Sequence, residues 1–241
     1  SHPIKGRIPE AIHKKANDLL EHEKTIYYER MAFMMELDNV SQNIDGSLLK
    51  LSIGGVKAFN QDNLYGSKLS GESFHLFVGF QNTVCTNLCI WTDGFKQKVK
   101  VRSLEELFEK TMDLFKEYDA VSQITALEQL TGKSLSEQQF AQLLGRARLY
   151  NYLPGNLKKE IPQLLISDTQ VNAIAQAYYT DKDFPKEEDG SISLWNMYNL
   201  FTGANKTSYI DSFLPRGQNS FQFIQSIQDA LDQGKDHWFL N

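Results

Sequence analysis

Hydrophobic and polar positions follow two different patterns in this chain, and the change lies near residue 102. Before it, short segments rich in β-branched and aromatic residues alternate with polar and glycine-containing stretches, which is typical of β-strands. The predicted strands cover residues 25–37, 46–60, 74–80, 83–92 and 95–102. The Gly54-Gly55 pair in the second strand predicts a bulge or a close approach of neighbouring backbone.

Beyond residue 102, apolar residues recur at the spacing of an α-helix. Ser103-x-x-Glu106 has the pattern of a capping box and predicts a helix start, and Gly132 predicts its end. Ser136 and Gln139 predict the start of a second helix that Pro154 ends. The predicted helices cover residues 103–130, 134–153, 167–180, 194–204 and 220–234, and a short helical pattern also covers residues 10–21.

The separation of strands from helices predicts an α+β fold. We expect an N-terminal antiparallel β-sheet of about five strands packed against a C-terminal bundle of about five helices. Because no flexible linker lies at the change of pattern, we predict a single compact domain over residues 1–241. A sub-boundary near 102/103 would separate a β-rich part, 25–102, from a helical part, 103–241.

Composition narrows the classes of function. The chain has 241 residues, of which 41% are hydrophobic, and a net charge of -5, so binding to nucleic acid requires a local basic patch. No apolar run approaches the roughly 20 residues of a membrane helix, and the first residues lack the apolar core of a signal peptide. With only 2 cysteines, we predict a cytoplasmic protein with no membrane partner.

Residues 82–94, NTVCTNLCIWTDG, form the densest cluster of chemically distinctive side chains. In a strand, Cys85 and Cys89 share a face but lie roughly 13 Å apart, too far for a disulfide or a shared metal ion. We therefore predict packed cysteines and no metal site. Asn82 and Asn87 are predicted structural polar residues, because a buried asparagine must find several hydrogen-bond partners.

Three segments carry a resemblance to a known family. They are GFQNTVCTNLCIWTDG at residues 79–94, the helix and closing helix of residues 193–231, and residues 2–33 at the start. Together they resemble a family of uncharacterised proteins labelled phage/plasmid-like, and are most similar to a subfamily carried by conjugative elements of gut anaerobes. The resemblance implies a mobile-element setting and supplies no catalytic residues.

The segment FKQKVKVR, residues 95–102, places four cations at a period of two. In a strand they would share one face and could contact phosphate, with Trp91 stacking on bases. The four are Lys96, Lys98, Lys100 and Arg102. The alternative is an edge strand whose lysines prevent edge-to-edge association. Arg146 and Arg148 either extend this patch or belong to a solvated helix end.

The segment LWNMYNLFTGANK, residues 194–206, leaves two alternatives for its polar residues. Its aromatic residues at helical spacing indicate core packing. Asn196 and Asn199 lie inside the predicted helix, where they either cap a loop or line a groove.

No known catalytic, phosphate-binding or cofactor-binding motif occurs in the chain. We therefore predict no cofactor and no catalytic residue, and carry three hypotheses. The first is a non-enzymatic nucleic-acid-associated protein that binds single-stranded or duplex DNA. The second is an interaction or regulatory module that engages a protein partner or a second copy of itself. The third, an enzyme, would need carboxylates that cluster only in the folded chain.

Overall fold

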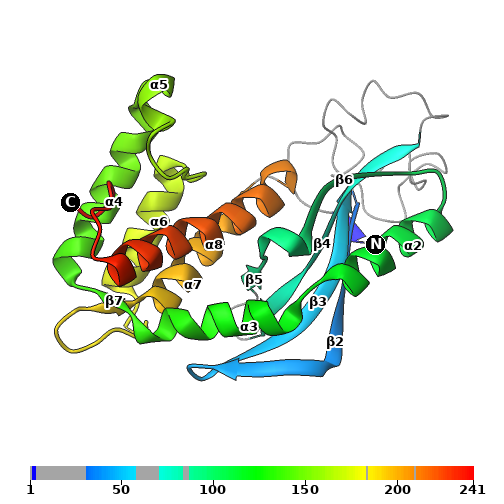
Figure 1. Cartoon of the computed structure of the whole chain (residues 1–241), viewed down its shortest axis with the longest axis horizontal. Helices are drawn as coiled ribbons and strands as arrows, with labels where there is room; N and C mark the ends of the chain where they lie inside the picture. The colour runs from blue at the N-terminus through cyan, green and yellow to red at the C-terminus, as the bar shows by residue number, and fades with distance from the viewer. Residues whose placement is uncertain (1, 4–30, 58–70, 84–86, 183, 209) are drawn as a thin grey trace.

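The computed structural model describes residues 2–3, 31–57, 71–83, 87–182, 184–208 and 210–241. Strands occupy one side of the molecule and most helices the other, as Figure 1 shows. The fold is α+β, as predicted. The predicted helix over residues 10–21, the beginning of the first predicted strand and Cys85 lie outside the described residues. The prediction of a single compact domain stays a prediction.

Within the described residues, six strands form one antiparallel sheet. They are β1 (His2–Pro3), β2 (Met31–Ile44), β3 (Ser47–Lys57), β4 (Glu72–Asn82), β5 (Asn87–Cys89) and β6 (Phe95–Val101). Strand β4 is central: β3 pairs with one edge, and β5 and β6 share the other. The predicted strand over residues 83–92 is shorter than expected, because a 3-10 turn at Thr92–Gly94 redirects the chain into β6.

The Gly54-Gly55 pair is a site of close backbone approach, with no register shift between β3 and β4 there. A Cβ atom on Gly54 would lie 2.3 Å from the carbonyl oxygen of Phe33, and one on Gly55 would lie 2.8 Å from a methyl carbon of Leu76. Glycine is therefore required at both positions by the packing of neighbouring strands.

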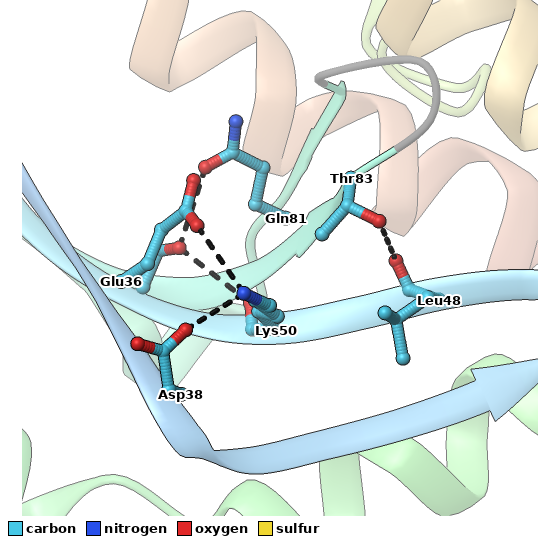
Figure 2. A network of polar contacts seen from close by, with 7 residues as sticks. Glu36, Asp38, Leu48, Lys50, Gln81 and Thr83 are labelled. Atoms are coloured by element: carbon cyan, nitrogen blue, oxygen red, sulfur yellow. Dashed lines mark hydrogen bonds and ion pairs between the residues drawn. The ribbon is translucent and has the colours of Figure 1, made fainter.

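Strand β2 carries the irregularity instead, with a register shift between Leu37 and Ser41. Figure 2 shows the polar network beside it, in which Lys50 Nζ lies 2.7 Å from Asp38 Oδ1 and 4.0 Å from Glu36 Oε2. The hydrogen bond from Lys50 holds the pKa of Asp38 below its usual value. The network fixes the bulged part of β2 against β3.

The helices are α2 (Leu104–Glu117), α3 (Ala120–Gln129), α4 (Glu137–Tyr152), α5 (Gly155–Lys158), α6 (Asp168–Thr180), α7 (Leu194–Asn205) and α8 (Ile210–Gln233). A small two-stranded sheet, β7 (Ser134–Leu135) with β8 (Ile192–Ser193), joins the starts of α4 and α7. The helix start predicted at Ser136 and Gln139 is a full capping box, with both reciprocal hydrogen bonds present. At the predicted box of Ser103, the serine accepts from the Glu106 amide, but the Glu106 carboxylate accepts from the amide of Arg102.

Two helix predictions were wrong in their bounds. The helix predicted over residues 103–130 is two helices, because Asp119 caps a new start by accepting from the amide of Ser122 at 3.0 Å. The helix predicted from residue 220 begins at Ile210, so Pro215 and Gly217 lie inside α8 and do not precede it. Pro215 is the sixth residue of α8, so it lies beyond the first turn, and its missing N–H removes one hydrogen bond from the helix interior.

The sheet is buried on both faces. One face carries Leu51, Ile53, Phe74 and Leu76, which join α2, α3, α4, α6, α7 and α8 in one hydrophobic core. On the other face, Val56, Phe77 and Leu88 pack against Leu214 near the start of α8. No helix within the described residues has both the length and the apolar character needed to cross a membrane.

Candidate functional site

A cavity of about 390 Å³ lies where the ends of β4 and β5 meet α6 and α7. Its apolar wall comes from the helices and the loop between them: Ala173, Ala177, Phe184, Leu200 and Ala204. Its polar wall is formed by four asparagines: Asn82, Asn87, Asn196 and Asn199. We call this cavity the asparagine pocket. Its volume falls within the range of small-molecule sites in proteins.

Local structure explains why these residues converge. Asn82 and Asn87 are direct partners in the β4–β5 ladder, so their side chains lie on the same face of the sheet. Ser193 begins α7 by accepting from the amide of Asn196 at 3.1 Å. From there, Asn196, Asn199 and Gly203 recur at intervals of three and four residues and share one face of α7.

Three of the asparagines are joined by hydrogen bonds. Asn82 Nδ2 donates to Asn199 Oδ1 at 3.4 Å, and Asn87 Nδ2 donates to the backbone carbonyl of Asn199 at 3.0 Å. Asn199 Nδ2 in turn donates to the carbonyl of Trp195 at 3.1 Å. The pair from the sheet thus anchors α7.

The side-chain oxygen of Asn87 has no hydrogen-bond donor among the described residues. No described residue donates a hydrogen bond to Asn87 Oδ1, although the Asn87 side chain is only 2% exposed. A buried acceptor without a donor costs about 1–3 kcal/mol. Gly203 adds no side chain beside it, since a Cβ at that position would lie 3.9 Å from both Oδ1 and Nδ2 of Asn87.

Most residues that line the pocket are uncharged. The charged residues that line it, Asp181 and Lys206, are exposed, and each already interacts with another group. Asparagine side chains do not ionise near neutral pH, so they can bind a ligand but cannot transfer protons. The arrangement is suited to recognition of a neutral molecule.

Sequence reasoning found part of this site. Asn196 and Asn199 line the pocket, which is one of the two alternatives for them, and Asn196 Nδ2 also donates to the carbonyl of Pro185 at 3.1 Å. Gly203 and the alanines of α6 were missed. The Asn-x-x-Asn-x-x-x-Gly spacing in residues 196–203 was the available signal.

The predicted row of cations on β6 is divided between the two faces of the sheet. A register shift between Phe74 and Leu76 places an extra residue in β6, so Lys96 lies on the face covered by α2, where it is 3.1 Å from Glu117 Oε2. Lys100 pairs with Ser73 on the opposite face. The prediction that all four cations share one face was therefore wrong, because a bulge changes the alternation of side chains. Lys98, Lys100 and Arg102 are exposed.

The other predicted nucleic-acid contacts lie elsewhere. Trp91 is half-buried, with its ring centroid 5.5 Å from that of Phe221. Arg146 lies on α4, where its guanidinium covers the ring of Trp238 at 5.2 Å and donates to the Trp238 carbonyl. Arg148 is exposed on the same helix. Figure 1 shows α4 and β6 at opposite sides of the molecule, so these residues do not form one surface.

Cys89 is a buried structural cysteine, as predicted. Burial raises the pKa of its thiol to about 12, although a hydrogen bond with Tyr198 opposes the rise. A thiol with so high a pKa is neither a nucleophile nor a metal ligand at neutral pH.

A larger cavity, of about 740 Å³, lies between the end of α4 and the start of α6. Its carboxylate, Asp168, is already held by Tyr152 Oη at 2.5 Å and by Asn151 Nδ2 at 2.7 Å. These bonds tie α4 to α6, so we assign Asp168 a structural role and keep the asparagine pocket as the candidate site.

The described residues contain no group of three or more histidine, cysteine, aspartate or glutamate side chains placed to hold a metal ion. In comparisons with known proteins, the model of the family described as "Domain of unknown function, B. Theta Gene description (DUF3871)" matches residues 1–240. No curated protein and no solved structure matches the chain.

Proposed function

We propose that this chain, which belongs to the DUF3871 family of domains of unknown function, is a non-enzymatic binding module for a small neutral molecule. The ligand would occupy the asparagine pocket between the sheet and helices α6 and α7. This proposal is a form of the regulatory hypothesis, with a small ligand as the bound partner.

One observation carries the proposal. The pocket places two half-buried amides, Asn196 and Asn199, beside an apolar wall that includes Ala173, Ala177 and Leu200. An apolar pocket with a few placed hydrogen-bonding groups is typical of small-molecule sites. A ligand N–H or O–H group would bond to these amides.

The chemistry of the pocket supports binding in preference to catalysis. An acid, base or nucleophile is needed for most reactions without a cofactor, and most residues that line the pocket offer amides, hydroxyls or apolar groups. The charged residues at the pocket, Asp181 and Lys206, are exposed and already engaged.

The test is a thermal-shift screen of the full chain against neutral heterocycles, amides and sugars, followed by titration of the hits. Asn196→Leu removes a half-buried amide that lines the pocket, and Asn172→Leu, an exposed asparagine on α6 outside the pocket, is the control. We expect hits to stabilise the wild type and the control but not Asn196→Leu. Hits that stabilise all three proteins equally, or no hits at all, would contradict the proposal.

A second candidate function is nucleic-acid association. Lys98, Lys100 and Arg102 are exposed at the end of β6, and cations on a sheet edge can contact phosphates. The mobile-element setting implied by the resemblance is compatible with this role and stays a prediction.

This candidate is tested by titrating labelled single-stranded and duplex DNA at several salt concentrations. The variant Lys98→Glu/Lys100→Glu/Arg102→Glu is compared with Lys159→Glu/Lys182→Glu/Lys235→Glu, which changes three exposed lysines elsewhere. Binding that weakens with salt and disappears only in the first variant would support the role. Equal loss in both variants would indicate general charge attraction.

A further inference from the structure

We infer that the cavity of about 740 Å³ beside α4 and α6 is a second binding site, which holds a small organic monocarboxylate through its carboxylate group and its apolar body. Arg216 is the cation that lines this cavity, so we call it the Arg216 cavity. It shares no lining residue with the asparagine pocket, and the inference therefore does not rest on the proposed function.

Arg216, near the start of α8, is held in place by a hydrogen-bonded serine. Its Nη1 group donates to Ser208 Oγ at 2.9 Å. Ser208 Oγ also accepts from Gln170 Nε2 at 2.9 Å and donates to Asn205 Oδ1 at 2.7 Å. The hydroxyl thus uses its one hydrogen and both of its lone pairs. Because its anchor is itself fixed, the guanidinium is positioned before any ligand binds, which lowers the cost of binding.

The remaining edge of the guanidinium matches a carboxylate. Among the described residues, Arg216 bonds through Nη1 alone, and no described carboxylate pairs with it. Nε and Nη2 form the other edge, and two parallel N–H groups of this kind bind a carboxylate in a bidentate manner. Neither nitrogen belongs to the described polar atoms that are both buried and unpaired, so this edge is accessible.

The surroundings of Arg216 increase the benefit of an anionic partner. The residue is half-buried, and burial lowers the pKa of its guanidinium from the usual value. Charged groups that have lost part of their hydration are normally paired in folded proteins. A carboxylate in the cavity would supply the partner that the described residues do not.

The rest of the cavity suits an apolar body. Residues 164–166 and Pro215 supply apolar surface to its wall. Asn219 of α8 fixes this wall, since its Oδ1 accepts from the Leu165 amide at 2.7 Å and its Nδ2 donates to the Gln163 carbonyl at 3.0 Å. Apolar surface with one well-placed charged group is typical of sites for small organic acids.

The charges of the cavity favour a ligand with a single negative charge. Its charged lining residues are Arg216 and Asp168, and their formal charges cancel. Asp168 already accepts hydrogen bonds from Tyr152 and Asn151, so it remains an anion that would oppose a second negative charge on the ligand. A monocarboxylate is therefore favoured over phosphate.

The experiment is a ligand-observed NMR titration of the full chain with four probes. They are 3-phenylpropanoate, its neutral amide, acetate, which has no apolar body, and inorganic phosphate. We expect 3-phenylpropanoate to bind about tenfold or more tightly than each of the others, because only this probe combines a charged bond to Arg216 with apolar contact. Equal binding of the acid and its amide, tighter binding of acetate or phosphate, or no binding of the acid would overturn the inference.

Two sets of variants locate the site. Arg216→Gln should abolish the preference for the acid over its amide, whereas Lys235→Gln, an exposed cation outside the cavity, should keep it. Leu165 lines the cavity and is 37% exposed, so its replacement does not disturb the core. Leu165→Glu should weaken binding of the acid relative to Leu165→Gln, with equal binding of the amide. This second set leaves Arg216 intact, so it tests the site even where Arg216→Gln fails to fold.

Two results from these variants would contradict the site. One is a preference for the acid that survives in folded Arg216→Gln, and the other is equal binding of the acid by the two Leu165 variants. Neither result bears on the asparagine pocket, which is tested with its own variants.

Discussion

At the scale of single residues, Gly203 and Cys89 each lead to a testable effect on binding or stability. Gly203 adds no side chain beside the buried amide of Asn87, where an added Cβ would lie 3.9 Å from both Oδ1 and Nδ2. Cys89 fills a fully buried position beside Tyr198, where its thiol cannot ionise at neutral pH. Gly203 affects the shape of the pocket, and Cys89 affects how stability changes with pH.

Gly203→Ala should stabilise the protein while it weakens ligand binding. Alanine in a helix interior is more favourable than glycine by roughly 0.5–1 kcal/mol. The added methyl group would lie 3.9 Å from the Asn87 amide atoms. Urea unfolding measures the first effect, and titration with the ligand measures the second. A stabilised variant with unchanged binding would place the ligand away from Asn87.

Cys89 should make the protein less stable as the pH rises above 9. In the unfolded chain the thiol ionises near its usual pKa of 9.0, whereas burial in the folded protein raises the pKa to about 12. The unfolded state therefore loses its proton first, and stability falls by about 1.4 kcal/mol per pH unit between these two values.

The pH effect is checked by urea unfolding of the wild type and Cys89→Ala between pH 8 and alkaline conditions. In a Cys85→Ser background, the remaining Cys89 should not react with a thiol reagent at pH 8 until denaturant is added. Rapid reaction of the native protein, or parallel pH profiles for the two proteins, would contradict the assignment.

At the scale of elements, irregular positions in the strands decide which side chains meet. The bulge in β6 separates Lys96 from Lys100, and the bulge in β2 places Asp38 beside Lys50. Lys57, at the end of β3, and Glu72, at the start of β4, form a buried ion pair, with Lys57 Nζ 3.3 Å from Glu72 Oε2.

Removal of one partner of this pair should be strongly destabilising. The Lys57 side chain is 1% exposed and that of Glu72 is 9% exposed, so either one left alone would be a buried charge. We expect Glu72→Gln to lower the free energy of unfolding by about 3–5 kcal/mol. The double variant Lys57→Met/Glu72→Leu should lose much less, and an equal loss in both, measured by urea unfolding, would show that the pair itself is not responsible.

At the scale of the whole molecule, the C-terminal segment returns to pack against the helices. Figure 1 shows the C-terminus beside α4. Phe239 is fully buried, and its ring centroid lies 4.8 Å from that of Phe223 in α8. Arg146 of α4 holds this segment through the ring and the carbonyl of Trp238.

Arg146→Ala should loosen the C-terminal segment. Loss of a charged hydrogen bond and a cation–π contact predicts a destabilisation of about 1–3 kcal/mol. Hydrogen exchange of residues 237–240 should become faster, while exposed Arg148→Ala should change stability by less than about 0.5 kcal/mol. Equal effects of the two variants would mean that Arg146 acts only through its charge.

Features that depend on residues close together in the sequence were predictable. Ser136 and Gln139 form their capping box, and the Gly54-Gly55 pair lies where strands approach closely, because these patterns act through bonds and contacts of local backbone. The break at Asp119 was also local but was hidden by the apolar periodicity that continues through residues 103–130. The helix predicted over residues 220–234 begins ten residues earlier, at Ile210, and contains Pro215.

The sequence alone determined the α+β class, the segregation of strands from helices and the burial of Cys89, since composition and periodicity set which backbone states and faces are favoured. Only the tertiary structure decided that Asn82 and Asn87 meet Asn199, more than a hundred residues away along the chain. It also decided that Lys96 and Lys100 lie on opposite faces of the sheet. The physical reason is the same for both: long-range register and packing depend on the whole set of neighbours, and no local pattern encodes them.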